Sequence, residues 1–535
     1  MSKIKRISWF VALGLVLLLL FYTRFINLDW GFPFPFHPDE RNMVTAIQSL
    51  NCGISNFREC LNPHFFAYGQ FPIYLASLLV NILKIDATLA LRIISVFSSI
   101  LTVIVSLNII KLIKNSFPWL VFSALILIFS PGLIQFAHFG TTESLLTLFL
   151  TSLIYVSLKY LSSKTSANYL TKVSGILCGL AIATKISSII FIFVPILAVL
   201  MRPIQPPRLE LAWWDRVKSI VFLGFVTIIV AIVFSPHNII SFPEFINSMR
   251  YESSVALGSL RVFYTRQFTD SIPIIFQATN IFPYALGRPA FILFLIGFFV
   301  LPYHRKINFL RLSFLLYFLP SAFAFTKWTR FMAPIFPLML IIAMLVVQQT
   351  YEFCLNTISN VKRKTKNEKL LLFAFCILLF VIIYPGIRFL KVYQNEDVRF
   401  QASRWMYQNI PSGSTILSES GNVVDIPIDR ETWNIERRTY NVISFDFYDL
   451  DFNPARQKEL SEVVKRADYI VIPSRRVFRS HDKKQFPKVN DYYSRLFTGK
   501  LGFKQIAEFK VLDDESAEET WTVFDHPIVR IFKRI

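Results

Sequence analysis

Long apolar runs separated by short polar segments fill most of the chain. Several of these runs, such as 11–21, 220–234 and 290–301, are almost free of charge and extend toward the roughly 20 residues that a helix needs to cross a bilayer. The alternating strands of a transmembrane barrel are not seen in the sequence. The pattern therefore predicts an α-helical protein that crosses the membrane many times.

The short connections between the runs give the predicted path its direction. Basic residues cluster in the connections at 3–6, 111–114, 202–218, 304–311 and 362–369. Placing these clusters in the cytoplasm gives about eleven spans, with a cytoplasmic amino terminus and an extracytoplasmic carboxyl-terminal segment. The first run, about 8–25, lacks a small-residue cleavage site after it, so we expect it to remain as a membrane anchor.

Two apolar runs do not fit a simple span. The run 71–83 has only about 13 residues and is predicted to lie against the outer membrane surface. The run 173–200 is longer than one span and carries Lys185 in its middle, where a charge is costly. We therefore predict two helices that meet near Thr184 and Lys185, at the outer surface.

The last part of the chain, residues 390–535, has a different pattern. Strand-like pieces such as 469–473 alternate with helix-like pieces such as 398–409, and turn signals lie between them. This length is enough for one soluble α/β domain. The sequence thus predicts a transmembrane core at 1–389 and an extracytoplasmic α/β domain at 390–535.

Composition and charge agree with a membrane environment. The chain is 54% hydrophobic with a mean hydropathy of +0.48, far above a soluble protein of this length. Its net charge is +21, but the tail is nearly neutral, so the excess lies in the short basic connections. A nucleic-acid surface would gather basic residues in one patch with interleaved aromatics, so no nucleic-acid partner is expected. We expect the protein in the plasma membrane.

Cysteines add one local alternative. Only Cys52 and Cys60 fall in a predicted outer loop, where they either form a disulfide or remain two free thiols. Spacings of Cys and His that would bind a metal are not seen in the sequence.

Several polar residues gather on the outer side of the predicted path. They are Asp39, Glu40, Glu143, Lys185, His237, Lys327 and Arg330. Cations on this side run against the positive-inside bias, so they need a partner there. An anionic lipid phosphate is the natural one.

The motif His37-Pro38-Asp39-Glu40 follows the first predicted span. A proline followed by two acids and an apolar pattern is typical of a helix start, where carboxylates suit the helix dipole. On spacing alone, Asp39 and Glu40 either begin an interfacial helix or take part in chemistry.

This motif resembles the acidic motif in the first outer loop of membrane glycosyltransferases of the GT-C fold, particularly bacterial relatives of protein O-mannosyltransferases and of lipid A aminoarabinose transferases. Further matches follow in the family's order: residues 138–146 with Glu143, Ala183-Thr184-Lys185, Ser235-Pro236-His237, and residues 327–337 with Arg330. The resemblance covers about residues 1–345. It implies a GT-C membrane core that transfers a sugar.

The resemblance implies a polyprenyl-phosphate-linked sugar donor, an acceptor hydroxyl on the extracytoplasmic face, and inversion at the anomeric carbon. Such a site must deprotonate the acceptor and stabilise charge on the departing phosphate. Asp39 is the expected general base, supported by the carboxylates of Glu40 and Glu143. Phosphate binding is assigned to Lys185 and Arg330, with Lys327 and His237 as weaker candidates. His37, Tyr68 and Gln70 are expected to position the acceptor or the sugar.

One departure concerns the stretch Tyr68-Gly69-Gln70, because some relatives carry a lysine near this point. Gln70 can donate a hydrogen bond but has no charge. Paired acids can hold a divalent ion, but no metal is indicated, and we expect no cofactor.

Two other classes of function remain. A membrane transporter or lipid flippase would line a passage with the same charges, although transporters tend to carry them at mid-membrane. A scaffold that only displays the tail would leave the outer acids and cations without a role. The sequence leaves open which hexose or pentose is moved, and whether the acceptor is a protein, a lipid or a polysaccharide.

Overall fold

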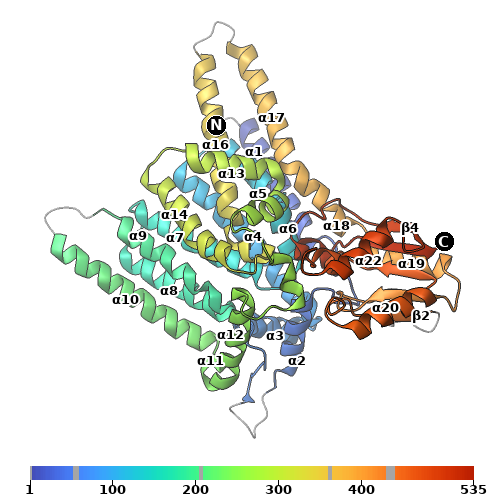
Figure 1. The fold of residues 1–535 in the computed structure, drawn as a ribbon. Coiled ribbons are helices and arrows are strands. Elements are labelled where there is room, and N and C mark those ends of the chain that lie inside the picture. The colour runs from blue at the N-terminus through green and yellow to red at the C-terminus, as the bar shows by residue number, and fades with distance from the viewer. Residues whose placement is uncertain (1–2, 52–58, 204–208, 360–363, 429–439) are drawn as a thin grey trace.

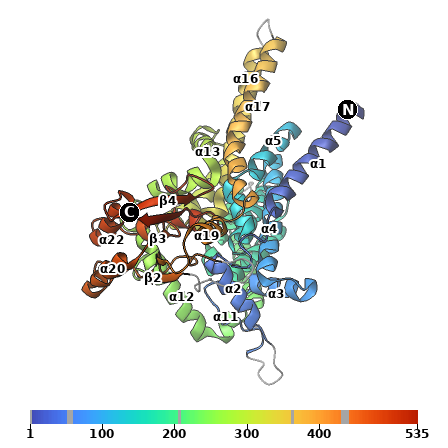
Figure 2. The same ribbon diagram turned by 90° about the vertical axis from the view of Figure 1, so that its right-hand side faces the viewer.

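The computed structural model describes residues 3–51, 59–203, 209–359, 364–428 and 440–535. Most of these residues form a helical bundle, with a smaller α/β domain against one side (Figure 1). The start of α1 (Lys3–Phe25) and the adjoining ends of α16 (Phe336–Ser359) and α17 (Lys364–Phe389) lie at one end of the bundle (Figure 2). The short helices α2 (Pro38–Ser49) and α12 (Phe242–Leu257) lie at the opposite end. Predicted cytoplasmic segments and predicted outer loops are thus at different ends.

The other helices of the bundle are mostly apolar and lie between these two ends. Their bounds are α4 (Ala87–Ile113), α5 (Phe117–Ile128), α6 (Pro131–His138), α7 (Glu143–Leu161), α8 (Ala167–Thr184), α9 (Phe193–Met201), α10 (Leu209–Phe234), α13 (Arg288–Val300) and α14 (Arg305–Phe323). The shorter helical pieces are α3 (Phe71–Leu83), α11 (His237–Ile240), η3 (Phe263–Phe268), the π-helical η4 (Gln277–Ile281) and η5 (Pro283–Gly287), α15 (Thr329–Met332) and η6 (Ala333–Ile335).

Within the described residues, six helices are long and apolar enough to cross a membrane, or seven if the bent pair α5 and α6 counts as one span. The six are Ala87–Ile113, Glu143–Leu161, Trp213–Phe234, Pro283–Val300, Thr329–Ile358 and Asn367–Gln394. The chain is therefore an integral membrane protein. The predicted count of eleven spans is not confirmed, because other apolar helices, such as 186–201, are short or interrupted.

A bend divides the apolar stretch from Pro118 to His138. Helices α5 and α6 differ in direction by 56°. Ser130 has the extended backbone (φ −75°, ψ 120°) that a following proline favours, and Pro131 cannot donate the helical hydrogen bond. The bend precedes the segment 139–142, which leads to Glu143 at the start of α7.

The break that the sequence predicted at Lys185 is present. Helix α8 ends at Thr184, and Lys185 takes an extended conformation (φ −158°, ψ 123°) before the 3-10 helix η2 (Ile186–Ile192). Helix α3 likewise has the bounds expected for the short outer run. Both features therefore have the positions that the sequence predicted.

In its described residues, 390–428 and 440–535, the tail forms a five-stranded mixed sheet in the order β2-β1-β3-β5-β4. The strands are β1 (Thr415–Glu419), β2 (Asn441–Phe445), β3 (Tyr469–Ile472), β4 (Phe503–Phe509) and β5 (Val529–Arg534). Strand β1 pairs in parallel with β2 and β3, and β5 pairs antiparallel with β3 and β4. The helices are α18 (Lys391–Gln394), α19 (Val398–Asn409), α20 (Pro454–Arg466), α21 (Arg476–Arg479), α22 (Pro487–Phe497) and α23 (Glu519–Val523).

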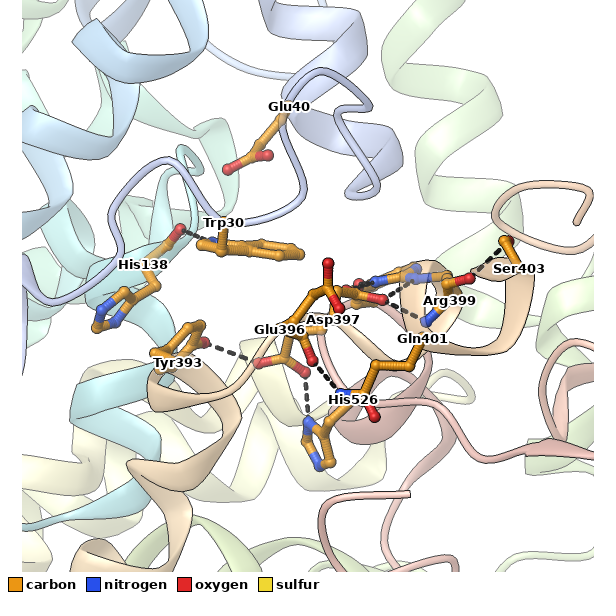
Figure 3. A network of polar contacts seen from close by, with 12 residues as sticks. Trp30, Glu40, His138, Tyr393, Glu396, Asp397, Arg399, Gln401, Ser403 and His526 are labelled. Carbon is orange, nitrogen blue, oxygen red and sulfur yellow. Dashed lines mark hydrogen bonds and ion pairs between the residues drawn. The ribbon is translucent and has the colours of Figure 1, made fainter. Parts of the chain in front are cut away.

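A buried polar network joins the tail to the bundle (Figure 3). The Tyr393 hydroxyl donates to Asp525 at 2.8 Å, and the Tyr393 ring stacks on His138 of α6 with centroids 3.7 Å apart. Asp525 also contacts the imidazole of His526, whose other nitrogen lies 3.0 Å from Asp514. Burial lowers the pKa of His526, but the two aspartates raise it to about 10. This imidazole is therefore charged at neutral pH and binds two carboxylates at the junction.

Candidate active site

Four charged residues from distant segments meet at the end of the bundle that carries α2, which the sequence predicts to be extracytoplasmic. Arg330 forms an ion pair with Asp39, and the Lys185 ammonium lies 3.7 Å from the Glu143 carboxylate. Their side chains are between 3% and 19% exposed. Each cation also interacts electrostatically with the carboxylate of the other pair. We call these four residues the paired-charge cluster; the sequence had assigned each of them to the site.

Asp39 lies in the first turn of α2, where the chain needs an N-cap. His37 is that cap: its Nδ1 accepts from the Asp39 backbone N–H at 3.2 Å. Burial alone would raise the pKa of Asp39, but Arg330, His37 and a hydrogen bond from Tyr68 hold that pKa below its ordinary value. Asp39 is therefore an ionised, partly accessible carboxylate at neutral pH, as a general base must be.

Arg330 is fixed by packing and keeps one donor free. Its guanidinium lies 4.6 Å from the centroid of the Trp328 ring. One terminal nitrogen of the guanidinium binds Asp39, while the buried Nε has no hydrogen-bond partner in the described part of the chain. A buried donor without a partner is costly, so this atom indicates a missing ligand with acceptor oxygens.

Lys185 lies above two aromatic rings because α8 ends just before it. Its Nζ is 4.9 Å from the centroid of Tyr68 and 5.3 Å from that of Phe331. Glu143, its carboxylate partner, stands in the first turn of α7, where the helix dipole favours an anion. At 3.7 Å the pair is too long for a strong hydrogen bond, so the ammonium retains donors for a ligand.

Tyr68 connects the two ion pairs, and Gly69 allows it to do so. The Gly69 N–H donates to the Thr184 carbonyl at 2.9 Å, and a Cβ at Gly69 would lie only 2.0 Å from the Ala183 carbonyl oxygen. Only glycine permits this approach to the end of α8. Tyr68 consequently lies beneath Lys185 and hydrogen-bonds Asp39.

Gln70 and His237 form a clamp beside the cluster rather than part of it. The Gln70 side chain accepts from the His237 backbone N–H at 3.0 Å and donates to Asn238 at 3.2 Å. The His237 ring contacts the Cys60 carbonyl and the Ser241 hydroxyl at 2.8 and 3.3 Å. These contacts join the outer loops. Cys60 is disulfide-bonded, and Cys52 lies outside the described residues.

Glu40 points away from its neighbour Asp39. Its carboxylate accepts from Arg92 at 3.0 and 2.9 Å and from the Gly140 N–H, and both charged side chains are fully buried. Arg92 also donates to the carbonyls of Leu28 and Trp30. This geometry favours a structural role over the predicted catalytic one.

Lys327 is also held apart from the cluster. Its ammonium donates to the Phe325 carbonyl at 3.0 Å, and it has no carboxylate partner among the residues that the structure describes. His37, in contrast, lies directly beside Asp39. Its ring packs against Phe139 and against Phe524 of the tail, with centroids 4.7 and 4.3 Å apart. Burial lowers the pKa of His37, so a neutral ring caps α2.

Two acids near the cluster were missed by the sequence reasoning. Glu518, just before α23 in the tail, accepts from the Thr329 N–H at 3.0 Å and from its hydroxyl at 2.9 Å. It also acts electrostatically on the neighbouring Arg330. Glu518 marks a helix start in the sequence, but nothing there indicates its contact with a loop almost two hundred residues earlier.

Glu252 on α12 is the second missed acid. Val255 packs with Trp328, and the Ala256 carbonyl accepts from the Thr326 N–H at 3.2 Å. Residues three and four positions apart share a helix face, so Glu252 lies on the face that meets the Arg330 segment.

The surroundings of Glu252 agree with that placement. It interacts electrostatically with Lys185, Arg330 and Asp39. Glu252 is exposed, so its carboxylate is accessible to a ligand. Glu252 has no hydrogen bond or ion pair to another described residue. It is a carboxylate beside the cluster with free acceptor oxygens.

A protein-family model matches part of the chain. Residues 71–240 match the family model described as dolichyl-phosphate-mannose-protein mannosyltransferase. This segment includes Glu143, Lys185 and His237. A search of curated proteins finds no match.

Solved structures match over nearly the whole chain. ArnT from Cupriavidus metallidurans, bound to undecaprenyl phosphate, has a TM-score of 0.50 at 12% identity, with 99% of this chain and 98% of that chain covered. The apo oligosaccharyltransferase of Archaeoglobus fulgidus has a TM-score of 0.51 at 12% identity, covering 100% and 90%. The complex of Archaeoglobus fulgidus AglB with an inhibitory peptide and a dolichol-phosphate gives 0.50 at 13% identity, covering 100% and 89%. The chain is therefore an integral membrane protein with the GT-C fold, and its residues 71–240 match the dolichyl-phosphate-mannose-protein mannosyltransferase family model.

Proposed function

We propose that the protein transfers a sugar from a polyprenyl-phosphate-linked donor to an acceptor hydroxyl on the extracytoplasmic face, with inversion at the anomeric carbon. The observation that carries the proposal is the paired-charge cluster, in which a partly accessible base and two cations meet and Arg330 keeps a free buried donor. The matched structures that contain undecaprenyl phosphate and dolichol-phosphate support a lipid carrier of the same kind.

In the proposed reaction, Asp39 accepts the proton of the acceptor hydroxyl. The acceptor oxygen attacks the anomeric carbon while the bond from that carbon to the phosphate oxygen breaks. The bonding electrons leave with the phosphate, whose charge is met by Lys185 and Arg330. Attack from the face opposite the phosphate inverts the anomeric configuration.

Donor binding should also change the pKa of Asp39, the proposed base. The phosphate competes with Asp39 for Arg330 and with Glu143 for Lys185, since each cation is already paired. When the guanidinium turns to the phosphate, Asp39 loses its counter-charge and its pKa rises. Asp39 thus becomes more basic when the donor is in place. Because both carboxylates face cations rather than each other, we propose that the reaction uses no resident metal ion.

The activity is tested by supplying purified protein with a radiolabelled polyprenyl-phosphate sugar and measuring free polyprenyl phosphate and labelled acceptor. A transferase releases carrier in proportion to sugar transferred. The alternative, a transporter or flippase, would move intact lipid between leaflets of a vesicle without releasing carrier. The position of the charges at one end of the bundle favours the transferase.

Removing either cation should weaken donor binding. Lys185→Ala and Arg330→Ala each delete a charge-assisted contact worth about 1.5 to 3 kcal/mol, or roughly 10-fold to 150-fold in affinity. Binding of polyprenyl phosphate to each variant measures the loss. Lys84→Ala, which removes an exposed lysine at the end of α3, is the matched control and should bind normally.

Lys327→Ala extends the same experiment. The Lys327 ammonium donates to a backbone carbonyl, so we expect this substitution to lower the affinity for polyprenyl phosphate much less than Lys185→Ala does. Normal carrier binding by both cluster variants would contradict the assignment of the phosphate site to Lys185 and Arg330.

We further propose that Glu252 accepts hydrogen bonds from hydroxyls of the donor sugar. Glu252→Gln removes the charge but keeps the shape, so the loss should be about 0.5 to 1.5 kcal/mol, up to roughly tenfold in KM for the donor. Because Gln lacks the negative charge that Glu252 places near Lys185 and Arg330, affinity for polyprenyl phosphate without a sugar should not fall. An equal effect on the sugar-free carrier would show that Glu252 acts on the cations instead.

A further inference from the structure

A cleft separate from the paired-charge cluster lies between the bundle and the tail. Its volume is about 630 Å³, within the range of ligand pockets. It is lined by η5, the first turn of α13, the last turns of α17, and the tail segment from Leu512 to Trp521. None of the four cluster residues lines it.

The floor of the cleft is a close helix crossing. A Cβ at Gly287 would lie 2.9 Å from the Pro385 ring, and one at Gly386 would lie 1.7 Å from the Phe129 carbonyl oxygen. Gly287 also has a positive φ of 83°, which ends the π-helical segment. α17 is therefore held in a fixed position at this crossing, and the cleft above it is built into the fold.

One side of the cleft is apolar and open to the surroundings of the bundle. Phe380, Val381 and Tyr384 on α17 are 57%, 44% and 47% exposed, and they belong to an apolar candidate span. In a membrane such exposed residues contact acyl chains. The opposite wall is formed by Trp521, which packs on Phe389 with centroids 5.1 Å apart.

Two arginines stand at the cleft without partners. Arg288 begins α13 and Arg388 lies in the last turn of α17, and both are exposed. Neither makes a hydrogen bond or ion pair with any other residue that the structure describes. Arg388 directly precedes the tail, so on the predicted path the pair lies at the outer membrane boundary.

The acidic residues of the lining do not cancel these two charges. Asp513 lies 2.7 Å from the Lys510 ammonium, and Asp514 lies 3.0 Å from the charged His526. Asp514 also accepts from the Trp521 indole N–H at 3.0 Å. Both carboxylates thus have cationic partners within the tail, so the cleft presents two unpaired guanidinium groups beside an apolar wall.

We propose that this cleft binds a glycerophospholipid with an anionic headgroup. Arg288 and Arg388 hold the headgroup phosphate, since guanidinium groups bind phosphate oxygens through paired N–H donors. An acyl chain lies along Phe380, Val381 and Tyr384. The bound lipid fills the junction between bundle and tail and holds the tail at the membrane surface.

Native mass spectrometry of the full chain in mild detergent tests the proposal with phosphatidylglycerol and phosphatidylcholine as probes. We expect phosphatidylglycerol to bind at least about tenfold more tightly. Arg288→Gln combined with Arg388→Gln should abolish this preference. Arg466→Gln, which removes an exposed arginine of α20, should keep it.

A second experiment, photolabelling by a lipid, uses only the wild-type protein. Phosphatidylglycerol with a photoreactive acyl chain should label the wild-type peptide that contains residues 380–388. Equal affinity for the two lipids, or labelling elsewhere, overturns the proposal. Displacement of the bound label by an equal concentration of polyprenyl phosphate would also overturn it, because the cleft would then belong to the donor carrier.

Discussion

Asp39→Asn is expected to lower turnover by about 10² to 10⁴-fold with a saturating donor. Asparagine keeps the size of the side chain but cannot take the acceptor proton. Affinity for the carrier should survive and even rise, because the substitution frees Arg330 from its ion pair. Transfer of labelled sugar and binding of polyprenyl phosphate measure the two effects separately. Asp29→Asn, an exposed acid in the loop before α2, is the matched control.

The pH dependence provides an independent check on Asp39. Arg330 and the other neighbours hold the pKa of Asp39 below its ordinary value, so the base form persists as pH falls. The value of kcat/KM reflects the ionisation of groups in the free enzyme. Protonation of Asp39 should therefore not lower kcat/KM until the pH is below about 4. Arg330→Ala should move this acid limb to higher pH. Wild-type turnover by Asp39→Asn would contradict its role as the base.

Local patterns in the sequence were enough to predict the class of fold and the place of several elements. Apolar runs and basic connections predicted the helical bundle, and the misplaced charge of Lys185 predicted the break at the end of α8. The short run 71–83 became α3 because its length was already too small for a span. Each of these features depends on neighbouring residues alone, so sequence reasoning could find it.

Contacts between distant segments were beyond such reasoning. The motif that carries Asp39 and Glu40 did not indicate that one carboxylate faces Arg330 while the other turns to Arg92. Successive residues at a helix start point in different directions, and the partner of each depends on how α4 and α15 pack. The sequence did not indicate Glu252 as a site residue for the same reason, since only the packing of α12 on Trp328 brings it to the site.

The tail shows the same limit. Its alternating helices and strands predicted an α/β domain, and a mixed sheet is observed. Nothing in its sequence indicated that Phe524 would pack on His37 or that Glu518 would bind Thr329. These contacts make the tail a wall of the site, so its removal would expose the cap of α2 and one side of Arg330.

Glu40→Ala should destabilise the protein strongly, by about 3 to 5 kcal/mol. The substitution leaves the Arg92 guanidinium fully buried with only backbone carbonyls for partners. It also removes the acceptor for the Gly140 N–H. The midpoint of thermal unfolding in detergent measures the loss, and Asp39→Asn provides the comparison, since Asp39 is partly accessible.

A double variant separates the structural role of Glu40 from a catalytic one. Replacing a buried ion pair by apolar residues of similar size is often neutral, whereas removing one partner is not. Glu40→Leu with Arg92→Met should therefore recover much of the stability that Glu40→Ala loses. If Glu40 acts only through the fold, the double variant also recovers turnover, because Asp39, Lys185 and Arg330 remain. If the double variant recovered stability but not turnover, Glu40 would have a catalytic role. Unchanged stability in Glu40→Ala would contradict the importance of the buried ion pair.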